Sequence, residues 1–132
     1  MTDEVDDLVG LRILVVEDNL LVADLICDFL ERFGCTVVGP VARLRAALDL
    51  AASESLDGAL LDVNLAGELS FPVATALGAR NVPVVFLTGY DDPAIFPREF
   101  QSMPRLAKPF HYKDLVEILS RQFGKTSRPP KP

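Results

Sequence analysis

Short apolar runs that alternate with helix-like segments constrain the fold of this chain more than any other feature. The runs cover residues 13–16, 36–39, 58–61, 84–87 and 105–107. Continuous apolar runs of this length are typical of strands that are buried on both faces of a parallel sheet. Strands that alternate with helices indicate right-handed crossover connections. The sequence therefore predicts an α/β fold with a doubly wound, five-stranded parallel sheet and helices on both faces.

Helix signals separate the runs. We expect helices at about residues 20–33, 43–53, 70–80 and 112–123. Asn19 can cap the first helix and Gly34 can end it, because these residue types favour those positions. Asp92 and Pro93 indicate one more helix after the fourth run, but Pro97 removes a backbone hydrogen bond and adds a clash worth about 3 kcal/mol. That helix should be short and weak.

Chemically reactive side chains stand where four of the apolar runs end. Glu17 and Asp18 follow the first run, Asp62 the third, Thr88 the fourth and Lys108 the fifth. In the flavodoxin-like strand order 2-1-3-4-5, the topological switch point lies between the first and third strands, where ligands bind outside the carboxyl ends. These side chains should therefore converge in one crevice.

The convergence predicts a site for a divalent cation and a phosphoryl group. Two carboxylates about 4 Å apart repel by about 4 kcal/mol at an effective dielectric constant of 20, so clustered acids need a cation. Oxygen ligands without Cys or His select a hard ion such as Mg²⁺. Asp62 could then bind the metal and also act as a nucleophile that forms an acyl phosphate. Lys108, as a mobile point charge, and the Thr88 hydroxyl could neutralise the phosphoryl oxygens.

Composition limits the other classes of function. The chain has 132 residues and a formal charge of −6, which argues against nucleic-acid binding. Its two cysteines lack metal or disulfide spacing and suit a reducing cytosol, so we expect a cytoplasmic protein. No apolar run approaches 18 residues, so no membrane span is expected. We expect one domain over residues 10–123, a disordered acidic N-terminus over 1–9 and a disordered proline-rich tail over 124–132.

Four strings in this order resemble the receiver domain of bacterial response regulators, the phosphoacceptor half of two-component signalling. They are ILVVEDN, ALLDVNL, VVFLTGY and LAKPF, and the resemblance covers residues 11–123. It implies that Asp62 is the phosphoacceptor. It also implies Asp18, Asp62 and the carbonyl of Asn64 as Mg²⁺ ligands, with Glu17 acting through water. Thr88 and Lys108 would contact the phosphoryl group.

The chain also departs from the usual receiver pattern. Receivers usually carry Tyr or Phe three residues before the lysine as a switch ring, whereas this chain has Arg105, and Ala66 replaces a common proline after the acceptor. The string around Thr88 is similar to a subgroup of stand-alone receivers with Phe-x-Thr-Gly-Tyr. In that subgroup the aromatic residue, here Tyr90, is thought to serve as the switch. The alternative for Tyr90 is a plain exposed loop aromatic.

The function that we expect is that of a single-domain response regulator rather than an enzyme. Asp62 would accept a phosphoryl group from a histidine kinase or histidine phosphotransfer protein, and phosphorylation would control binding to an unknown downstream protein. Two alternatives stay open: a phosphate sink or shuttle in a phosphorelay, and a non-phosphorylated interaction module of the same fold. A small phosphatase or nucleotide-binding protein would need a substrate pocket or a glycine-rich phosphate cradle after the first strand, and EDNLL supplies no cradle.

Overall fold

The computed structural model of the protein describes residues 6–89 and 96–125. Its main sheet has five parallel strands in the order β2-β1-β3-β6-β7. They are β1 (Arg12–Val16), β2 (Thr36–Val41), β3 (Gly58–Asp62), β6 (Val84–Thr88) and β7 (Arg105–Ala107). Because β6 and β7 are the fourth and fifth strands of this sheet, the observed order confirms the predicted order 2-1-3-4-5.

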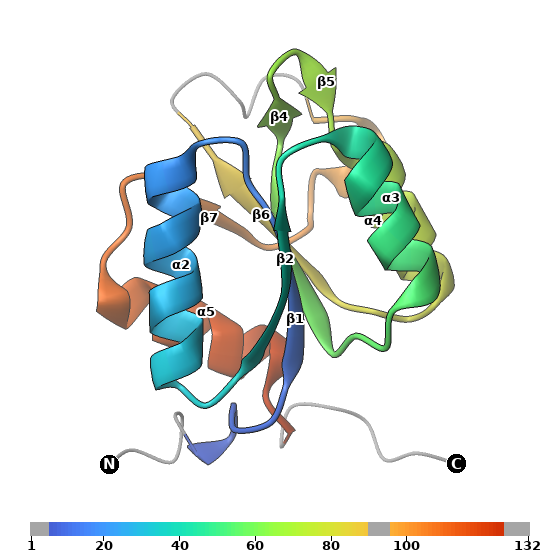
Figure 1. Cartoon of the computed structure of the whole chain (residues 1–132). Coiled ribbons are helices and arrows are strands. Elements are labelled where there is room, and N and C mark those ends of the chain that lie inside the picture. The colour runs from blue at the N-terminus through green and yellow to red at the C-terminus, as the bar shows by residue number, and fades with distance from the viewer. Residues whose placement is uncertain (1–5, 90–95, 126–132) are drawn as a thin grey trace.

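Helices cover both faces of the sheet, as predicted. In Figure 1, α2 (Leu20–Arg32) and α5 (Tyr112–Phe123) lie on one face, and α3 (Leu44–Ser53) and α4 (Phe71–Ala79) lie on the other. Each face has its own hydrophobic core, and every residue of β3 and β6 is buried. Burial on both sides explains why these two strands read as continuous apolar runs rather than as alternating patterns.

The first helix begins and ends where the sequence predicts. The Asn19 side chain accepts a hydrogen bond from the Val22 amide at 3.1 Å and caps the helix. Gly34 follows the helix with a φ of +84°, a left-handed conformation that glycine adopts without steric cost. The apolar stripe of α2 buries Ala23, Ile26 and Leu30 against the sheet.

A small hairpin after β3 was not predicted. It consists of β4 (Asn64–Leu65) and β5 (Glu68–Leu69), which pair in antiparallel fashion. The turn between them places Ala66 at φ 51° and Gly67 at φ 98°. Such hairpins are usually recognised by an Asn-Gly signature at the two turn positions. This turn has alanine in place of asparagine, and alanine rarely adopts a positive φ, so the sequence did not indicate the hairpin. The Asn64 side chain accepts a hydrogen bond from the Gly67 amide at 2.7 Å and helps to hold the turn.

The weak helix predicted from Asp92 lies largely outside the described residues. Within residues 96–125, a single 3₁₀ turn, η2 (Arg98–Phe100), follows Pro97. Phe96 and Phe100 are buried against α4 and β6, where their rings contact those of Phe71 and Phe86 at centroid distances between 5.2 and 6.0 Å. Packing of aromatic rings thus anchors the described part of this segment.

Residues before β1 also take part in the packing. Leu8 is fully buried in the core on the α2 and α5 face. The Lys125 amide also donates to the Asp7 carbonyl at 3.3 Å, so the two ends of the described chain meet. Among the described residues, no helix is long and apolar enough to cross a membrane.

Candidate functional site

The sheet brings the predicted site residues together at the carboxyl ends of its strands, a border that we call the carboxyl-terminal edge. Glu17 and Asp18 follow β1, Asp62 is the last residue of β3, Thr88 is the last residue of β6, and Lys108 follows β7. The strands are parallel, so their carboxyl ends share this edge (Figure 1). The crossover connections thus place residues together that are far apart in the sequence.

Three carboxylates form a tight cluster at the switch point. Glu17, Asp18 and Asp62 each offer one oxygen, and these oxygens lie within 4.8 Å of one another. Glu17 is 2% exposed and Asp62 is 5% exposed, whereas Asp18 lies at the solvent-exposed mouth of the cluster. Little water can therefore screen the repulsion between Glu17 and Asp62.

Lys108 is the cation of the cluster. Its Nζ lies 2.7 Å from Oε1 of Glu17 and 3.3 Å from Oδ1 of Asp62. The other oxygen of Glu17 accepts a hydrogen bond from the Asn19 amide at 3.0 Å. The lysine is therefore held by two carboxylates. The Lys108 amide donates to the Thr88 carbonyl at 2.8 Å, which ties β6 to the residue that follows β7.

The crowding shifts the pKa values of Asp62, Asp18 and Lys108. Burial, hydrogen bonds to the Glu17 and Asp18 carboxylates and the charge of Glu17 raise the pKa of Asp62 to about 8, against the opposing charge of Lys108. Burial raises the pKa of Asp18, but hydrogen bonds to Asp62 and Glu17 outweigh it, and that pKa lies below its usual value. Burial also disfavours the charged form of Lys108, yet the two carboxylates keep its pKa above the ordinary value.

The donor set of the cluster fits a hard divalent cation. Its ligand atoms are all carboxylate oxygens, which are the ligands that Mg²⁺ prefers. One ammonium group faces three carboxyl groups. The pKa of Asp62 is raised, so its carboxyl group is largely protonated and neutral. A divalent cation would remove this imbalance and allow Asp62 to ionise. The predicted magnesium site is thus consistent with the geometry.

Three other predicted residues are placed less directly. Thr88 is 3% exposed, and its strand partner Ala107 immediately precedes Lys108, so it adjoins the cluster. The side chain of Asn64 is engaged in the hairpin turn, which leaves only its backbone for the role that the resemblance implies. Tyr90 lies outside the described residues.

The sequence did not single out Arg43 as a residue of this edge. A pocket of about 460 Å³ adjoins the cluster and is lined by Asp18, Ala42, Arg43, Leu65, Ala66 and Glu68. Arg43 is the residue before α3, and no motif in its neighbourhood distinguishes it from an ordinary exposed arginine. Only the tertiary structure brings it beside Asp18.

A profile of the family "Response regulator receiver domain" matches residues 13–120 of the chain. The protein belongs to this family. Among solved structures, the receiver domain resembles SdrG from Sphingomonas melonis, with 41% identity, a TM-score of 0.76 and coverage of 86% of this chain and 95% of SdrG. It also resembles the receiver domain of the sensor histidine kinase PA1611 from Pseudomonas aeruginosa, with 30% identity, a TM-score of 0.73 and coverage of 86% and 98%.

A curated relative is the sensory transduction protein LytT of Bacillus subtilis, which is 30% identical over 121 residues. This match covers 89% of the receiver domain but 50% of LytT, so the chain spans about half the length of that relative. The PA1611 structure has a magnesium ion coordinated in its active-site cleft. The predicted family and fold are therefore confirmed, and a relative of the same fold binds the predicted cation.

Proposed function

We propose that this receiver domain accepts a phosphoryl group on Asp62 from a histidine kinase or histidine phosphotransfer protein. Phosphorylation would then control its binding to a downstream protein. The observation that carries the proposal is the cluster of Glu17, Asp18 and Asp62, in which the first and the last are buried and Lys108 is the cation that contacts both. Such clusters are costly to the fold, and groups with strongly shifted pKa values concentrate at functional sites, which supports a chemical role.

The chemistry follows from the position of Asp62 at the end of β3. An oxygen of its carboxylate attacks phosphorus, a new O–P bond forms, and the bond from phosphorus to the donor breaks. The donor leaves with the bonding electron pair, as a neutral imidazole from phosphohistidine or as acetate from acetyl phosphate. Because the pKa of Asp62 is about 8, the carboxyl must first lose its proton, and Lys108 at 3.3 Å stabilises the resulting anion.

Mg²⁺ would be held by Asp18, Asp62 and the carbonyl of Asn64, with Glu17 acting through water. The hairpin supports the role of Asn64. The Ser70 amide donates to the Val63 carbonyl, and Asn64 pairs with Leu69 at the next position of the ladder. Residue pairs in an antiparallel ladder alternate between hydrogen-bonded and non-bonded, so the Asn64 carbonyl faces away from β5. The cation would neutralise charge on the phosphoryl oxygens.

The remaining roles are proposals of the same kind. Thr88 would donate its hydroxyl to a phosphoryl oxygen, and Lys108 would move from its carboxylate partners to another. Tyr90 would be the switch residue of a Phe-x-Thr-Gly-Tyr receiver. The protein would act in the cytoplasm as a phosphoacceptor rather than as an enzyme. With a net charge of −6 it would bind proteins rather than nucleic acids.

Labelling with radioactive acetyl phosphate tests the phosphoacceptor role. We expect incorporation of one phosphoryl group in the presence of Mg²⁺ and little incorporation in EDTA. Hydroxylamine should release the label, because it cleaves acyl phosphates and leaves phosphoserine and phosphothreonine intact. Label that resists hydroxylamine would contradict an aspartyl phosphate.

A pull-down separates a signalling switch from a phosphate sink. The bait is the receiver domain with Mg²⁺, in the presence or absence of beryllofluoride, a mimic of the phosphoryl group. A switch should retain at least one protein only with beryllofluoride. A sink or shuttle should retain only proteins that carry a phosphotransfer histidine, and a purely structural module should retain the same proteins in both cases.

A further inference from the structure

A pocket opens beside the acidic cluster, on the side where the candidate site meets solvent. Its volume is about 460 Å³, within the range of pockets that bind small molecules. Glu17, Asp62 and Thr88 are buried. Asp18 is exposed, and it also lines this pocket. A molecule that delivers a phosphoryl group to Asp62 must place its other atoms where there is room, and the pocket at Asp18 provides that room.

The lining of the pocket is part apolar and part charged. Its apolar side chains are Ala42, Leu65 and Ala66. Arg43 supplies a positive charge, and Asp18 and Glu68 supply negative charges. A cation bound at the acidic cluster would offset the charge of Asp18, which leaves Arg43 and Glu68 as the opposed charges of the pocket. Such a lining suits a small group that has an apolar part and can carry charge.

The Arg43 side chain has no partner among the described residues. Arg43 precedes α3 with an extended backbone (φ −125°, ψ 149°) and does not cap this helix through its side chain. Within residues 6–89 and 96–125, its guanidinium takes part in no ion pair. Arg45, by contrast, pairs with Asp49 at 3.5 Å on the surface of α3. The N–H donors of Arg43 are therefore available to a ligand in the pocket.

We propose that Arg43 is a specificity-determining residue that binds the leaving group of an acyl phosphate. This inference rests on the proposed function and names the class of small-molecule phosphodonor that the same site prefers. When Asp62 attacks phosphorus, the O–P bond of the donor breaks, and the donor's carboxylate leaves with the electron pair. Arg43 donates hydrogen bonds to the carboxylate on which this charge develops, and the apolar lining contacts its alkyl group.

The charge of the leaving group determines what Arg43 can discriminate. Phosphohistidine and phosphoramidate carry a P–N bond and release a neutral imidazole or neutral ammonia, so no negative charge develops for a guanidinium to stabilise. An interaction accelerates a reaction only if it is stronger in the transition state than in the ground state. Arg43 therefore favours acyl phosphates over donors with a P–N bond, and Glu68, with the opposite charge, disfavours them.

The test compares acetyl phosphate with phosphoramidate, which transfer the same phosphoryl group but differ in the leaving group. The rate constant of phosphorylation in saturating Mg²⁺ is measured for each donor by intact-mass spectrometry. We expect Arg43→Met to lower the rate constant for acetyl phosphate about fivefold, the scale of one hydrogen bond, and to leave that for phosphoramidate unchanged. Arg45→Met is the control, because it removes the same charge from the same helix but outside the pocket. The control should match the wild type with both donors.

Two further variants sharpen the result. Arg43→Lys keeps the charge but loses the planar fork that matches a carboxylate, so its rate constant for acetyl phosphate should lie between those of the wild type and the Met variant. Glu68→Gln removes the opposing charge and should raise the rate constant for acetyl phosphate. High salt should shrink both differences, because the pocket is open to solvent and its charges are screened.

Nuclear magnetic resonance locates the leaving group in the wild type itself. The probe is acetonylphosphonate, which keeps the carbonyl group of acetyl phosphate but has a P–C bond that Asp62 cannot break. At saturation in Mg²⁺, it should shift the Nε–H resonance of Arg43 and leave that of Arg45 in place. An unshifted Arg43 resonance would put the leaving group elsewhere and overturn the assignment.

The outcomes separate the role of Arg43 from the proposed function. An equal fall of the rate constants for both donors in Arg43→Met, or no fall with either, overturns the specificity role and leaves Asp62 as the phosphoacceptor. Failure of both donors to phosphorylate the wild type would overturn the proposed function, and the role of Arg43 with it.

Discussion

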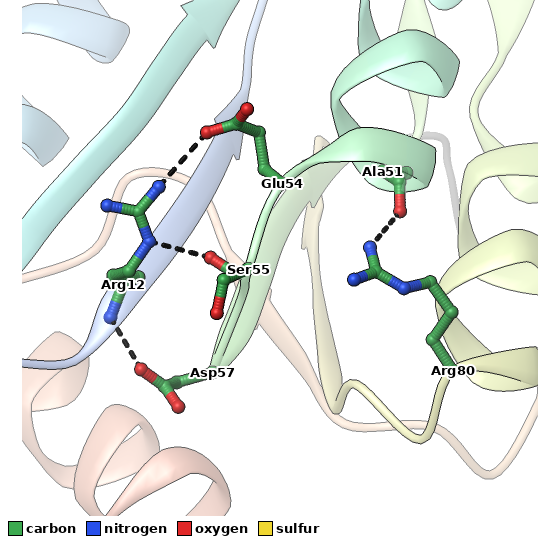
Figure 2. A network of polar contacts seen from close by, with 6 residues as sticks. All are labelled: Arg12, Ala51, Glu54, Ser55, Asp57 and Arg80. Atoms are coloured by element: carbon green, nitrogen blue, oxygen red, sulfur yellow. Dashed lines mark hydrogen bonds and ion pairs between the residues drawn. The ribbon is translucent and has the colours of Figure 1, made fainter.

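Charged side chains gather both at the amino ends of the strands, the amino-terminal edge of the main sheet, and at the carboxyl ends, but the charges are arranged in opposite ways. At the amino-terminal edge, Arg12 donates from Nε to the Ser55 carbonyl at 2.7 Å and from Nη2 to Glu54 at 3.0 Å, and its amide donates to Asp57 at 2.8 Å (Figure 2). The side chains of Arg12 and Glu54 remain 38% and 37% exposed. Water and matched partners together satisfy this network.

At the carboxyl-terminal edge, Glu17 and Asp62 are almost fully buried, and one lysine serves both. Charged groups that have partners and contact water hold the amino ends of the strands in place at little cost in free energy. Charge that is buried and unbalanced destabilises the fold until a cation arrives. The difference between the two edges therefore separates a structural network from a reactive one, although both consist of ordinary acids and bases.

The most direct test of the difference between the two edges is the same substitution at both ends of β3. Asp62→Asn should reduce labelling by acetyl phosphate below detection, because an amide cannot act as the nucleophile. Asp57→Asn, at the amino-terminal end, should be labelled like the wild type. Intact-mass spectrometry measures both. Equal labelling of the two variants would place the phosphoacceptor elsewhere.

The response to Mg²⁺ should also distinguish the two edges. A cation that binds only the folded state stabilises it by about 1.4 kcal/mol at ten times its dissociation constant, so millimolar Mg²⁺ should raise the melting temperature of the wild type. Asp18→Asn should lose most of this increase. Glu54→Gln, which removes an acid from the opposite edge, should keep it, as followed by circular dichroism. An identical Mg²⁺ response in both variants would argue against a metal site at the carboxyl-terminal edge.

The pH dependence of stability should show the cost of the buried cluster. The folded protein holds a proton on Asp62 up to about pH 8, whereas an unfolded aspartate loses it near 3.8. Between these values the folded state binds more protons than the unfolded state, so the free energy of unfolding should fall as the pH rises from 5 to 8 without metal. Lys108, with its pKa above the ordinary value, stays charged in both states over this window.

Urea denaturation in EDTA at several pH values measures this slope. Asp62→Asn should flatten it, because the amide does not titrate, and saturating Mg²⁺ should flatten it in the wild type by favouring the ionised carboxylate. Stability that does not fall from pH 5 to 8 in the metal-free wild type would contradict the raised pKa of Asp62, because an aspartate that is ionised in both states contributes no slope.

The smallest effect is expected at the amino-terminal edge. Arg12→Met removes one hydrogen bond to a carbonyl and a partly exposed ion pair, and should lower the free energy of unfolding by about 1 kcal/mol. Labelling by acetyl phosphate should not change. A large loss of labelling in a folded Arg12→Met protein would show that the two edges are coupled through the sheet.

Much of the fold and of the candidate site could be predicted from the sequence alone. Strands that are buried on both faces must be continuously apolar, so β3 and β6 were recognisable, and Asn19 and Gly34 marked the ends of α2 through local hydrogen bonding and backbone conformation. Strand–helix alternation allows few topologies, so the order of the elements was enough to place Glu17, Asp18, Asp62 and Lys108 at one edge. These features depend on residues that are close in the chain or on general rules of connection.

Other features were decided only by the tertiary structure. The hairpin at Ala66 depends on a backbone conformation that alanine does not favour by itself, and Leu8 is part of the core through packing against residues that are distant in the sequence. The raised pKa of Asp62 and the stacking of Arg105 on Phe96 arise from distances between residues on different strands and loops. Burial and through-space electrostatics depend on such distances, and sequence patterns report only local spacing.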